Sequence, residues 1–177
     1  MRELIIGGAR SGKSSLALVR ARQSDKRVVF IATALASDEE MRDRIERHRS
    51  ERPAHWDTIE VGKDLGPTIA AAMQSESLLI VDCLTVWLSH VLFDPRADFA
   101  IDEVAFARHR EELLQAVGAL TCDAILISNE VGWGIVPEHA SARRFRDEQG
   151  RLNQQIASVC ERVTLVAAGL PLTLKPQ

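Results

Sequence analysis

The stretch Leu-Ile-Ile-Gly-Gly-Ala-Arg-Ser-Gly-Lys-Ser-Ser, residues 4–15, decides the fold of this chain. Its apolar run ends at Gly7, and residues 7–14 match G-x-x-x-x-G-K-[ST] at every defined position. Glycines let backbone N–H groups converge on phosphate oxygens, and the N-terminus of a following helix adds a positive dipole. The stretch therefore predicts a buried strand, a phosphate-binding loop and a helix that begins near Lys13.

Each position of the predicted loop has a defined task. Lys13 reaches the β- and γ-phosphates of a nucleoside triphosphate, and the Ser14 hydroxyl is placed to bind Mg²⁺. A chance glycine-rich turn is the alternative, but the strand before the motif and the helix after it favour a nucleotide site. The predicted nucleotide-binding loop consists of Gly7, Gly8, Ala9, Arg10, Ser11, Gly12, Lys13 and Ser14.

Apolar β-type runs alternate with helical patterns along the rest of the chain. Such runs, separated by helices, are typical of a parallel sheet covered on both faces. We expect an α/β fold with a mostly parallel sheet and P-loop NTPase (RecA-like) architecture, in a single domain over residues 1–177. Strands are expected at 27–33, 58–61 (an edge), 77–82, 122–128, 162–167 and 170–174, and helices at 38–49, 66–74, 84–93, 102–120 and 138–160.

Composition excludes several classes of protein. The 177 residues include 22 Lys and Arg against 25 Asp and Glu, and 46% of them are hydrophobic. The net charge of −3 argues against a general nucleic-acid binder, which needs a basic face. The apolar start is too short for a secretory signal, and residues 77–93, the longest nearly uncharged stretch, contain Asp82 and His90. Three cysteines without CxxC spacing indicate buried thiols in a reducing cytosol. We expect a cytoplasmic protein with no membrane span.

Asp82 directly follows the apolar run 78–81. An acid at the carboxyl end of such a strand is the natural partner for the magnesium ion of a bound nucleotide. The alternative is a helix N-cap for the segment that starts at Leu84. Both roles are compatible with one side chain.

A charged segment over residues 37–52 contains one histidine, His48, among acids and arginines. Segments of this composition are usually solvated helix faces with i,i+4 ion pairs. Met41, Ile45 and His48 stand at i, i+4 and i+7, which places the histidine on the apolar side. Spacing alone leaves two interpretations open: a packed core histidine, or a nucleophilic imidazole beside guanidinium groups that hold phosphate.

Four segments together resemble one family. They are GGARSGKS at 7–14, RIERHRSERPAHW at 44–56, DCLTVWLSH at 82–90 and SNEVGWGIVPEHASARRFRDEQGRLNQ at 128–154. The family is that of the bifunctional adenosylcobinamide kinase/adenosylcobinamide-phosphate guanylyltransferases of cobalamin biosynthesis. The resemblance is collinear and reaches from residue 5 to about residue 169. The second and fourth segments are much more specific than the phosphate loop.

The resemblance implies two reactions. The aminopropanol hydroxyl of adenosylcobinamide is phosphorylated with ATP or GTP, and GMP is then transferred from GTP to that phosphate, which gives adenosylcobinamide-GDP and pyrophosphate. It further implies a covalent GMP–histidine, here on His48, with Lys13 and Mg²⁺ stabilising the charge of the leaving pyrophosphate. Some relatives have His-His where this chain has Arg47 and His48. The family also implies a homotrimer, for which the surfaces around Trp87 and Trp133 are candidate interfaces.

By the same resemblance, nucleotide contacts extend beyond the loop. The Glu60 carboxylate can accept hydrogen bonds from the N1–H and N2–H₂ edge of guanine, which would favour GTP over ATP. Asp82 stands where some relatives carry Glu. The additional contacts are Ala32, Thr33, Ala34, Arg49, Ser50, Glu51, Arg52, Glu60 and Asp82, and the implied magnesium ligands are Ser14 and Asp82.

Three questions remain open at the level of the sequence. Trp133 follows the strand expected at 122–128, where it can either cover a flat corrinoid or fill a subunit interface. A P-loop kinase of another small metabolite explains the loop and Asp82 but gives His48 no purpose. A RecA-like nucleotide-dependent switch would hydrolyse ATP without a covalent intermediate.

Overall fold

The computed structural model describes residues 1–34, 39, 46, 49–50, 52–93 and 101–176. The elements in chain order are β1 (Arg2–Gly7), α1 (Lys13–Arg22), β2 (Arg27–Ala32), β3 (Asp57–Glu60), α3 (Leu65–Ala72), β4 (Ser77–Asp82), α4 (Leu84–Leu92), α5 (Glu103–Gly118), β5 (Asp123–Asn129), α6 (Ala140–Val159), β6 (Arg162–Ala167) and β7 (Leu170–Lys175).

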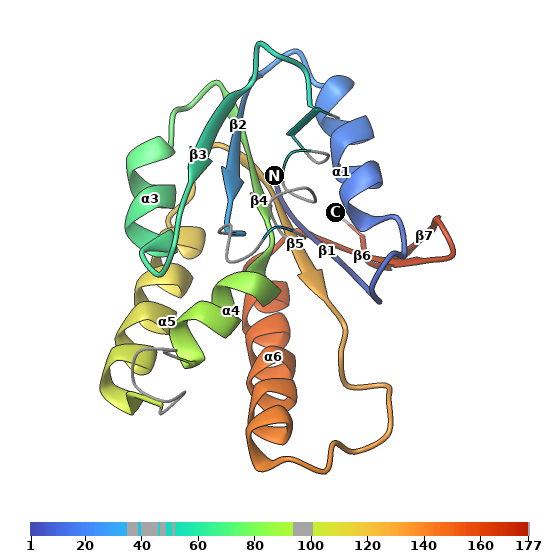
Figure 1. Ribbon diagram of the computed structural model, residues 1–177. Coiled ribbons are helices and arrows are strands. Elements are labelled where there is room, and N and C mark those ends of the chain that lie inside the picture. The colour runs from blue at the N-terminus through green and yellow to red at the C-terminus, as the bar shows by residue number, and fades with distance from the viewer. Residues whose placement is uncertain (35–38, 40–45, 47–48, 51, 94–100, 177) are drawn as a thin grey trace.

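The strands form a seven-stranded sheet with the order β3-β2-β4-β5-β1-β6-β7 (Figure 1). Neighbouring strands from β3 to β6 are parallel, and β7 pairs antiparallel with β6. This arrangement confirms the predicted α/β fold with a mostly parallel sheet. β3 lies at one edge of the sheet, as its short and weakly apolar sequence predicts.

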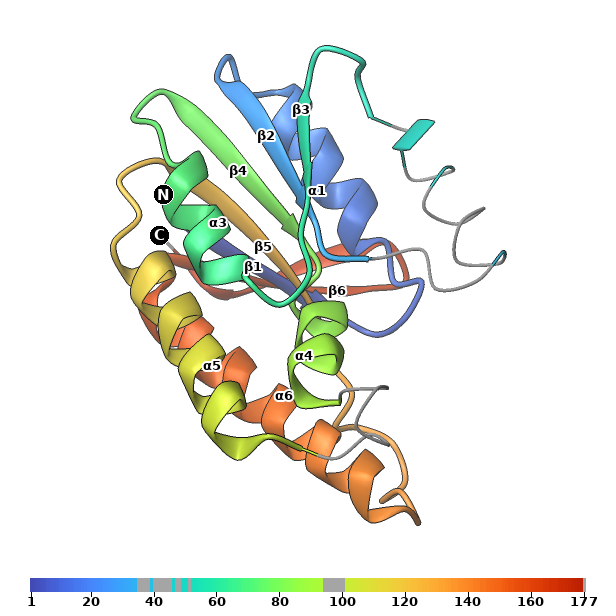
Figure 2. The same ribbon diagram turned by 60° about the vertical axis from the view of Figure 1, so that its left-hand side comes forward.

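Helices cover both faces of the sheet, as expected. α1 lies on one face, and α3, α4, α5 and α6 lie on the other (Figures 1 and 2). Because side chains alternate along a strand, neighbours such as Ile5 and Leu4 enter different cores. Ile5 packs in the core beneath α1, whereas Leu4 packs beneath α3, α4, α5 and α6. Burial on both faces explains why the strands are continuously apolar.

Trp87 occupies the core of the larger helical layer and has no exposed surface. Its indole N–H donates to the carbonyl oxygen of Lys63 at 2.9 Å, which satisfies the only polar atom of the ring. The expectation that a surface around Trp87 serves an interface is therefore wrong. The physical reason is that the apolar stripe of α4 turns inward, so the indole is used for packing within one chain.

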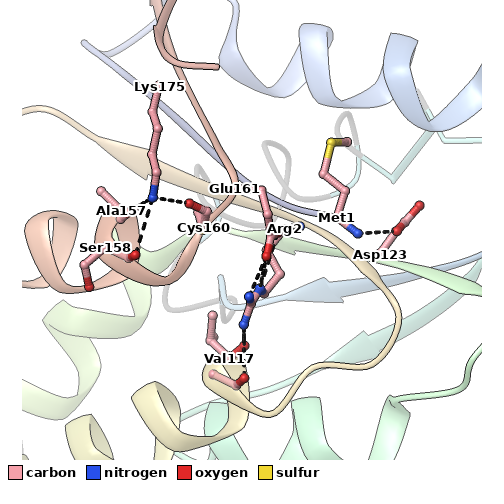
Figure 3. Close-up of polar contacts among 10 residues, drawn as sticks. Met1, Arg2, Val117, Asp123, Ala157, Ser158, Cys160, Glu161 and Lys175 are labelled. Carbon is pink, nitrogen blue, oxygen red and sulfur yellow. Dashed lines mark hydrogen bonds and ion pairs between the residues drawn. The ribbon is translucent and has the colours of Figure 1, made fainter. Parts of the chain in front are cut away.

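Polar contacts fasten the strands at their amino ends (Figure 3). The terminal ammonium of Met1 lies 2.6 Å from an Asp123 carboxylate oxygen, at the start of β5. Arg2 Nε donates to Glu161 Oε1 at 3.0 Å, just before β6. Lys175 Nζ donates to the Cys160 carbonyl oxygen at 2.5 Å and to that of Ala157 at 3.2 Å, where a cation stabilises the carboxyl end of α6. These contacts align β1, β5 and β6, and they leave the opposite, carboxyl edge free for loops.

Two further expectations, the helix over residues 38–49 and the absence of a membrane span, concern segments that the structure describes only in part. The predicted helix over 38–49 lies outside the described residues, except for residues 39, 46 and 49. Among the helices that the structure describes, none has the length and apolar character needed to cross a lipid bilayer.

Candidate nucleotide-binding site

The carboxyl ends of the parallel strands bring the predicted site residues to one edge of the sheet. Ala32 of β2 pairs with Glu60 on one side and with Asp82 on the other. Gly7 of β1 pairs with Asn129 of β5 and with Val166 of β6. Ligands of open α/β sheets bind at this edge. Segments that are far apart in the sequence therefore meet where β1 passes into the phosphate loop.

The phosphate loop connects β1 to α1 through backbone conformations that require glycine. Gly12 is the N-cap of α1 with φ 100°, a left-handed conformation that is costly for a residue with a Cβ. A Cβ on Gly7 would stand 2.3 Å from the carbonyl oxygen of Val166. The glycines of the motif are therefore needed to form the loop, apart from any contact with phosphate.

Backbone hydrogen bonds hold the loop from two sides. The Gly169 N–H, in the turn between β6 and β7, donates to the Ser11 carbonyl oxygen at 2.8 Å. The Glu130 N–H, directly after β5, donates to the Gly7 carbonyl oxygen at 3.0 Å. The loop is thus fixed to the strands on both sides of β1, and its N–H groups need little reorganisation to meet phosphate.

Lys13 is buried and bends back over the loop. Its Nζ donates to the Gly8 carbonyl oxygen at 2.6 Å and lies 3.5 Å from Ser11 Oγ. Burial lowers the pKa of Lys13, while the nearby Cys83 and Asp82 raise it. The charges of Lys13 and Asp82 thus interact across the end of the sheet, although 69 residues separate them in the sequence.

Asp82 is half-buried at the carboxyl end of β4. The alternative that it caps the following helix is wrong, because the N-cap residue of α4 is Cys83 and not Asp82. The Asp82 carboxylate lies at the same edge of the sheet as the phosphate loop, with which it interacts through the charge of Lys13.

The chemistry of Ser14 and Asp82 fits magnesium. Mg²⁺ usually binds through one or two carboxylates together with substrate phosphates, rather than in an all-protein cage. Ser14 supplies a hydroxyl next to Lys13 at the start of α1, and Asp82 supplies a carboxylate. In the part of the chain that the structure describes, no cluster of three or more His, Cys, Asp or Glu side chains could hold a metal ion. A nucleotide-bound Mg²⁺ is the metal that these residues would suit.

The last residue of β2 and the two residues after it differ in exposure. Ala32 is buried, and Ala34 is partly exposed. The Thr33 side chain has no exposed surface, and its hydroxyl is hydrogen bonded to the backbone of Cys83. The Thr33 side chain is therefore directed into the protein.

Arg52 contacts the sheet through its side chain. Its guanidinium lies 3.7 Å from the centroid of the Phe30 ring in β2, a cation–π contact. Arg49, Ser50 and Glu60 are exposed to solvent. His48 and Glu51 lie outside the described residues. The position of His48 on the apolar side of a helix therefore stays a prediction.

A buried polar network under the carboxyl end of β5 was not predicted. Ser128 Oγ donates to Asn153 Oδ1 at 2.6 Å, and Gln149 Nε2 donates to the same oxygen at 3.0 Å. Asn153 Nδ2 donates to the Asn129 carbonyl oxygen at 3.0 Å, and Thr85 Oγ1 accepts from the Asn129 N–H at 2.8 Å. The available signal was the i,i+4 spacing of Gln149 and Asn153, which places both on the same side of the helix as the apolar Leu152 and Ile156.

The loop between β5 and α6 presents apolar side chains to solvent. Trp133 is 76% exposed, and Ile135 and Val136 are also exposed. A shallow groove of about 330 Å³ lies nearby in the fold, lined by α4, the residue after it and the start of α6: Ser89, Phe93, Ser141, Ala142 and Phe145. Both interpretations of Trp133, corrinoid contact and subunit contact, are compatible with this exposure.

Comparisons with known proteins give a consistent result. A family model described as cobinamide kinase / cobinamide phosphate guanyltransferase matches residues 3–174. The bifunctional adenosylcobalamin biosynthesis protein CobP of Pseudomonas aeruginosa is 47% identical over 175 residues, which are 99% of this chain and 98% of that protein. The bifunctional adenosylcobalamin biosynthesis protein CobU of Escherichia coli is 38% identical over 179 residues, with 97% and 98% covered.

Solved structures confirm the architecture. An ATPase from the type III secretion system of pathogenic bacteria matches with a TM-score of 0.56 at 12% identity, over 97% of this chain and 56% of that one. The RadB recombinase matches with a TM-score of 0.51 at 15% identity, over 93% and 73%. At such low identity the likeness concerns the fold alone, and it confirms the P-loop NTPase (RecA-like) prediction.

Proposed function

The chain belongs to the cobinamide kinase / cobinamide phosphate guanyltransferase family, and on that premise we propose that both reactions take place at the carboxyl edge of the sheet. It is a transferase of adenosylcobalamin biosynthesis that phosphorylates cobinamide and transfers a guanylyl group to cobinamide phosphate. Membership of this family decides against a kinase of another metabolite and against a nucleotide-dependent switch. The observation that carries the proposal is the phosphate loop with Lys13 beside Asp82.

In the kinase step, the loop holds the triphosphate of ATP or GTP. The aminopropanol hydroxyl oxygen of adenosylcobinamide attacks the γ-phosphorus and its proton passes to water, while the bond to the β–γ bridging oxygen breaks and the nucleoside diphosphate leaves. Lys13 stabilises the charge that develops on the transferred and leaving phosphates. Ser14 and Asp82 are the residues that would hold Mg²⁺, which supplies further neutralisation of the phosphate charge when bound.

In the guanylyl step, a neutral His48 imidazole nitrogen attacks the α-phosphorus of GTP. The bond to the β-phosphate oxygen breaks, pyrophosphate leaves, and a phosphoramidate links GMP to the histidine. A phosphate oxygen of adenosylcobinamide phosphate then attacks the same phosphorus and releases the imidazole as adenosylcobinamide-GDP forms. His48 lies outside the described residues, so this step is supported by its place in the R-I-x-x-H-R-x-x-R-P segment and by the family.

The proposed nucleotide contacts run along the edge of the sheet. Glu60 lies four strand spacings from β1, about 19 Å at about 4.8 Å per spacing. Its carboxylate can therefore meet guanine only if the nucleotide lies along this edge. The remaining proposed contacts are the phosphate loop, Ala32, Thr33, Ala34, Arg49, Ser50, Glu51, Arg52 and Asp82.

We also propose a cytoplasmic homotrimer built from single-domain chains. Cys83, Cys122 and Cys160 are free thiols, which fits a reducing compartment. The edge strand β7 presents Leu170 and Leu172 to solvent with 72% and 58% of their surface exposed. Exposed apolar side chains on an unpaired strand edge are typical of a surface that pairs with another chain.

Labelling with GTP that carries ³²P in the α-phosphate tests the covalent step. The wild-type chain should retain label that is lost in acid and kept in alkali, as expected for a phosphoramidate. His48→Ala should lose it, because no nucleophile remains. His55→Ala is the matched control: His55 lies a few residues away, is exposed, and has no assigned role. Full labelling of His48→Ala, or loss of label in His55→Ala alone, would contradict the assignment.

A further inference from the structure

The Thr33 hydroxyl makes a two-sided contact with the backbone of Cys83. It donates to the Cys83 carbonyl oxygen at 2.8 Å and accepts from the Cys83 N–H at 2.8 Å. The backbone N–H of Thr33 donates to the Asp82 carbonyl oxygen at 3.0 Å. Three hydrogen bonds thus join Thr33, the residue after β2, to Asp82 at the end of β4 and to Cys83 directly after it.

These bonds continue the sheet past its last backbone pair. Ala32 and Asp82 are the final paired residues of β2 and β4. Beyond them the Thr33 side chain replaces the backbone as the partner of Cys83. The only donor of the hydroxyl is used in this contact, and the side chain has no exposed surface. Thr33 therefore cannot offer its hydroxyl to a nucleotide.

The residues held in this way face the phosphate loop. Lys13 interacts electrostatically with both Asp82 and Cys83. Burial raises the pKa of the Cys83 thiol to about 11, with a further increase from the neighbouring Asp82 carboxylate. Cys83 is also the N-cap of α4, and its carbonyl oxygen accepts a hydrogen bond from the backbone N–H of Trp87 at 3.2 Å. A shift of Cys83 would move the Asp82 backbone and the start of α4 together.

We propose that Thr33 is a positioning residue that fixes the Asp82 carboxylate where it serves nucleotide-bound Mg²⁺. This inference rests on the proposed magnesium role of Asp82. Thr33 acts through the backbone, and any contact of the 32–34 segment with nucleotide is made by other atoms. Outer-shell partners of this kind commonly change metal affinity by about 10- to 100-fold when they are removed.

The variant Thr33→Val has nearly the same shape but lacks the hydroxyl. The Cys83 carbonyl oxygen would keep its bond from Trp87, while the Cys83 N–H would lose its acceptor. Thr33→Ser keeps the hydroxyl and is the matched control. If Thr33→Val does not fold, Thr33→Ala takes its place, because the smaller side chain leaves room for a water at the Cys83 N–H.

Calorimetric titration can measure the affinity for a GTP analogue that carries a methylene group between the α- and β-phosphates, which prevents transfer of GMP. Each protein is titrated with Mg²⁺ and with EDTA. The Mg²⁺-dependent gain is the ratio of the affinity with Mg²⁺ to the affinity in EDTA for the same protein, and we expect Thr33→Val to lower this ratio about tenfold. Thr33→Ser should retain the gain.

Asp82→Asn separates failure of this inference from failure of the proposed function. If Asp82→Asn keeps the full Mg²⁺-dependent gain, the metal role of Asp82 is wrong and the Thr33 inference is overturned with it. If Asp82→Asn loses the gain while Thr33→Val keeps it, Thr33 is merely structural and only the present inference is overturned. The double variant Thr33→Val, Asp82→Asn should bind the GTP analogue in the presence of Mg²⁺ no more weakly than Asp82→Asn alone.

Discussion

Gly7, where β1 passes into the phosphate loop, has no room for a side chain. A Cβ there would stand 2.3 Å from the Val166 carbonyl oxygen and 2.8 Å from Ser11 Oγ, whereas at Gly8 no heavy atom lies within 4 Å. We expect Gly7→Ala to lower the free energy of unfolding by about 1–3 kcal/mol, because the backbone of β6 must shift. Gly8→Ala should change it by less than about 0.5 kcal/mol. Urea denaturation followed by circular dichroism measures both, and equal stability of the two variants would contradict the argument.

The position of the phosphate loop was predictable because its backbone requirement is local. The loop between Gly7 and Ser14 needs glycines and a lysine at set positions, so its place in the fold could be predicted from eight consecutive residues. The role of Thr33 could not, because its partner Cys83 stands 50 positions later and only the β2–β4 pairing brings them together. The helix-cap alternative for Asp82 failed because α4 begins at Leu84, so that its N-cap is the neighbouring residue Cys83 and not Asp82.

At the scale of elements, α6 joins the core through side chains that are polar as well as apolar. Asn153 Nδ2 donates to the Asn129 carbonyl oxygen, and its Oδ1 accepts from Ser128 and Gln149. Asn153→Leu should lower the free energy of unfolding by about 1–3 kcal/mol, because these buried groups lose their partner. Gln154→Leu, on the exposed side of the same helix, is the control and should stay within about 0.5 kcal/mol of wild type. Thermal unfolding measures both, and an Asn153→Leu protein as stable as the control would show that the network adds no stability.

Strands were easier to predict than the inward faces of helices. A continuous apolar run such as 78–81 is explained by burial on both faces of the sheet, and β4 contains this run. In α6 the buried side chains include the polar Gln149 and Asn153 beside the apolar Leu152 and Ile156. The role of such a buried polar side chain can be predicted only when its hydrogen-bond partner is known. Asn153 has its partners Ser128 and Asn129 on another element, β5.

At the scale of the whole molecule, the order of strands is what creates the site. A local pattern predicts that strands are parallel, but it does not predict that β5 lies between β4 and β1. That order places the ends of β4 and β5 beside the phosphate loop, and it sends β6 and β7 to the other side of β1. The loop is consequently supported by Glu130 on one side and by Gly169, in the turn before β7, on the other.

The outer strand β7 is where the chain should meet its copies. Leu172 is 58% exposed and pairs with Leu165 of β6, so the apolar surface continues across two strands. Burial of this surface between subunits would stabilise the proposed trimer, and a buried, unpaired carboxylate would oppose it. Light scattering after gel filtration should therefore give three times the chain mass for wild type and a smaller mass for Leu172→Glu. Val104→Glu is the control, since Val104 is equally apolar and exposed on α5. A monomeric wild type, or a Leu172→Glu protein that keeps the wild-type mass, would contradict an interface at β7.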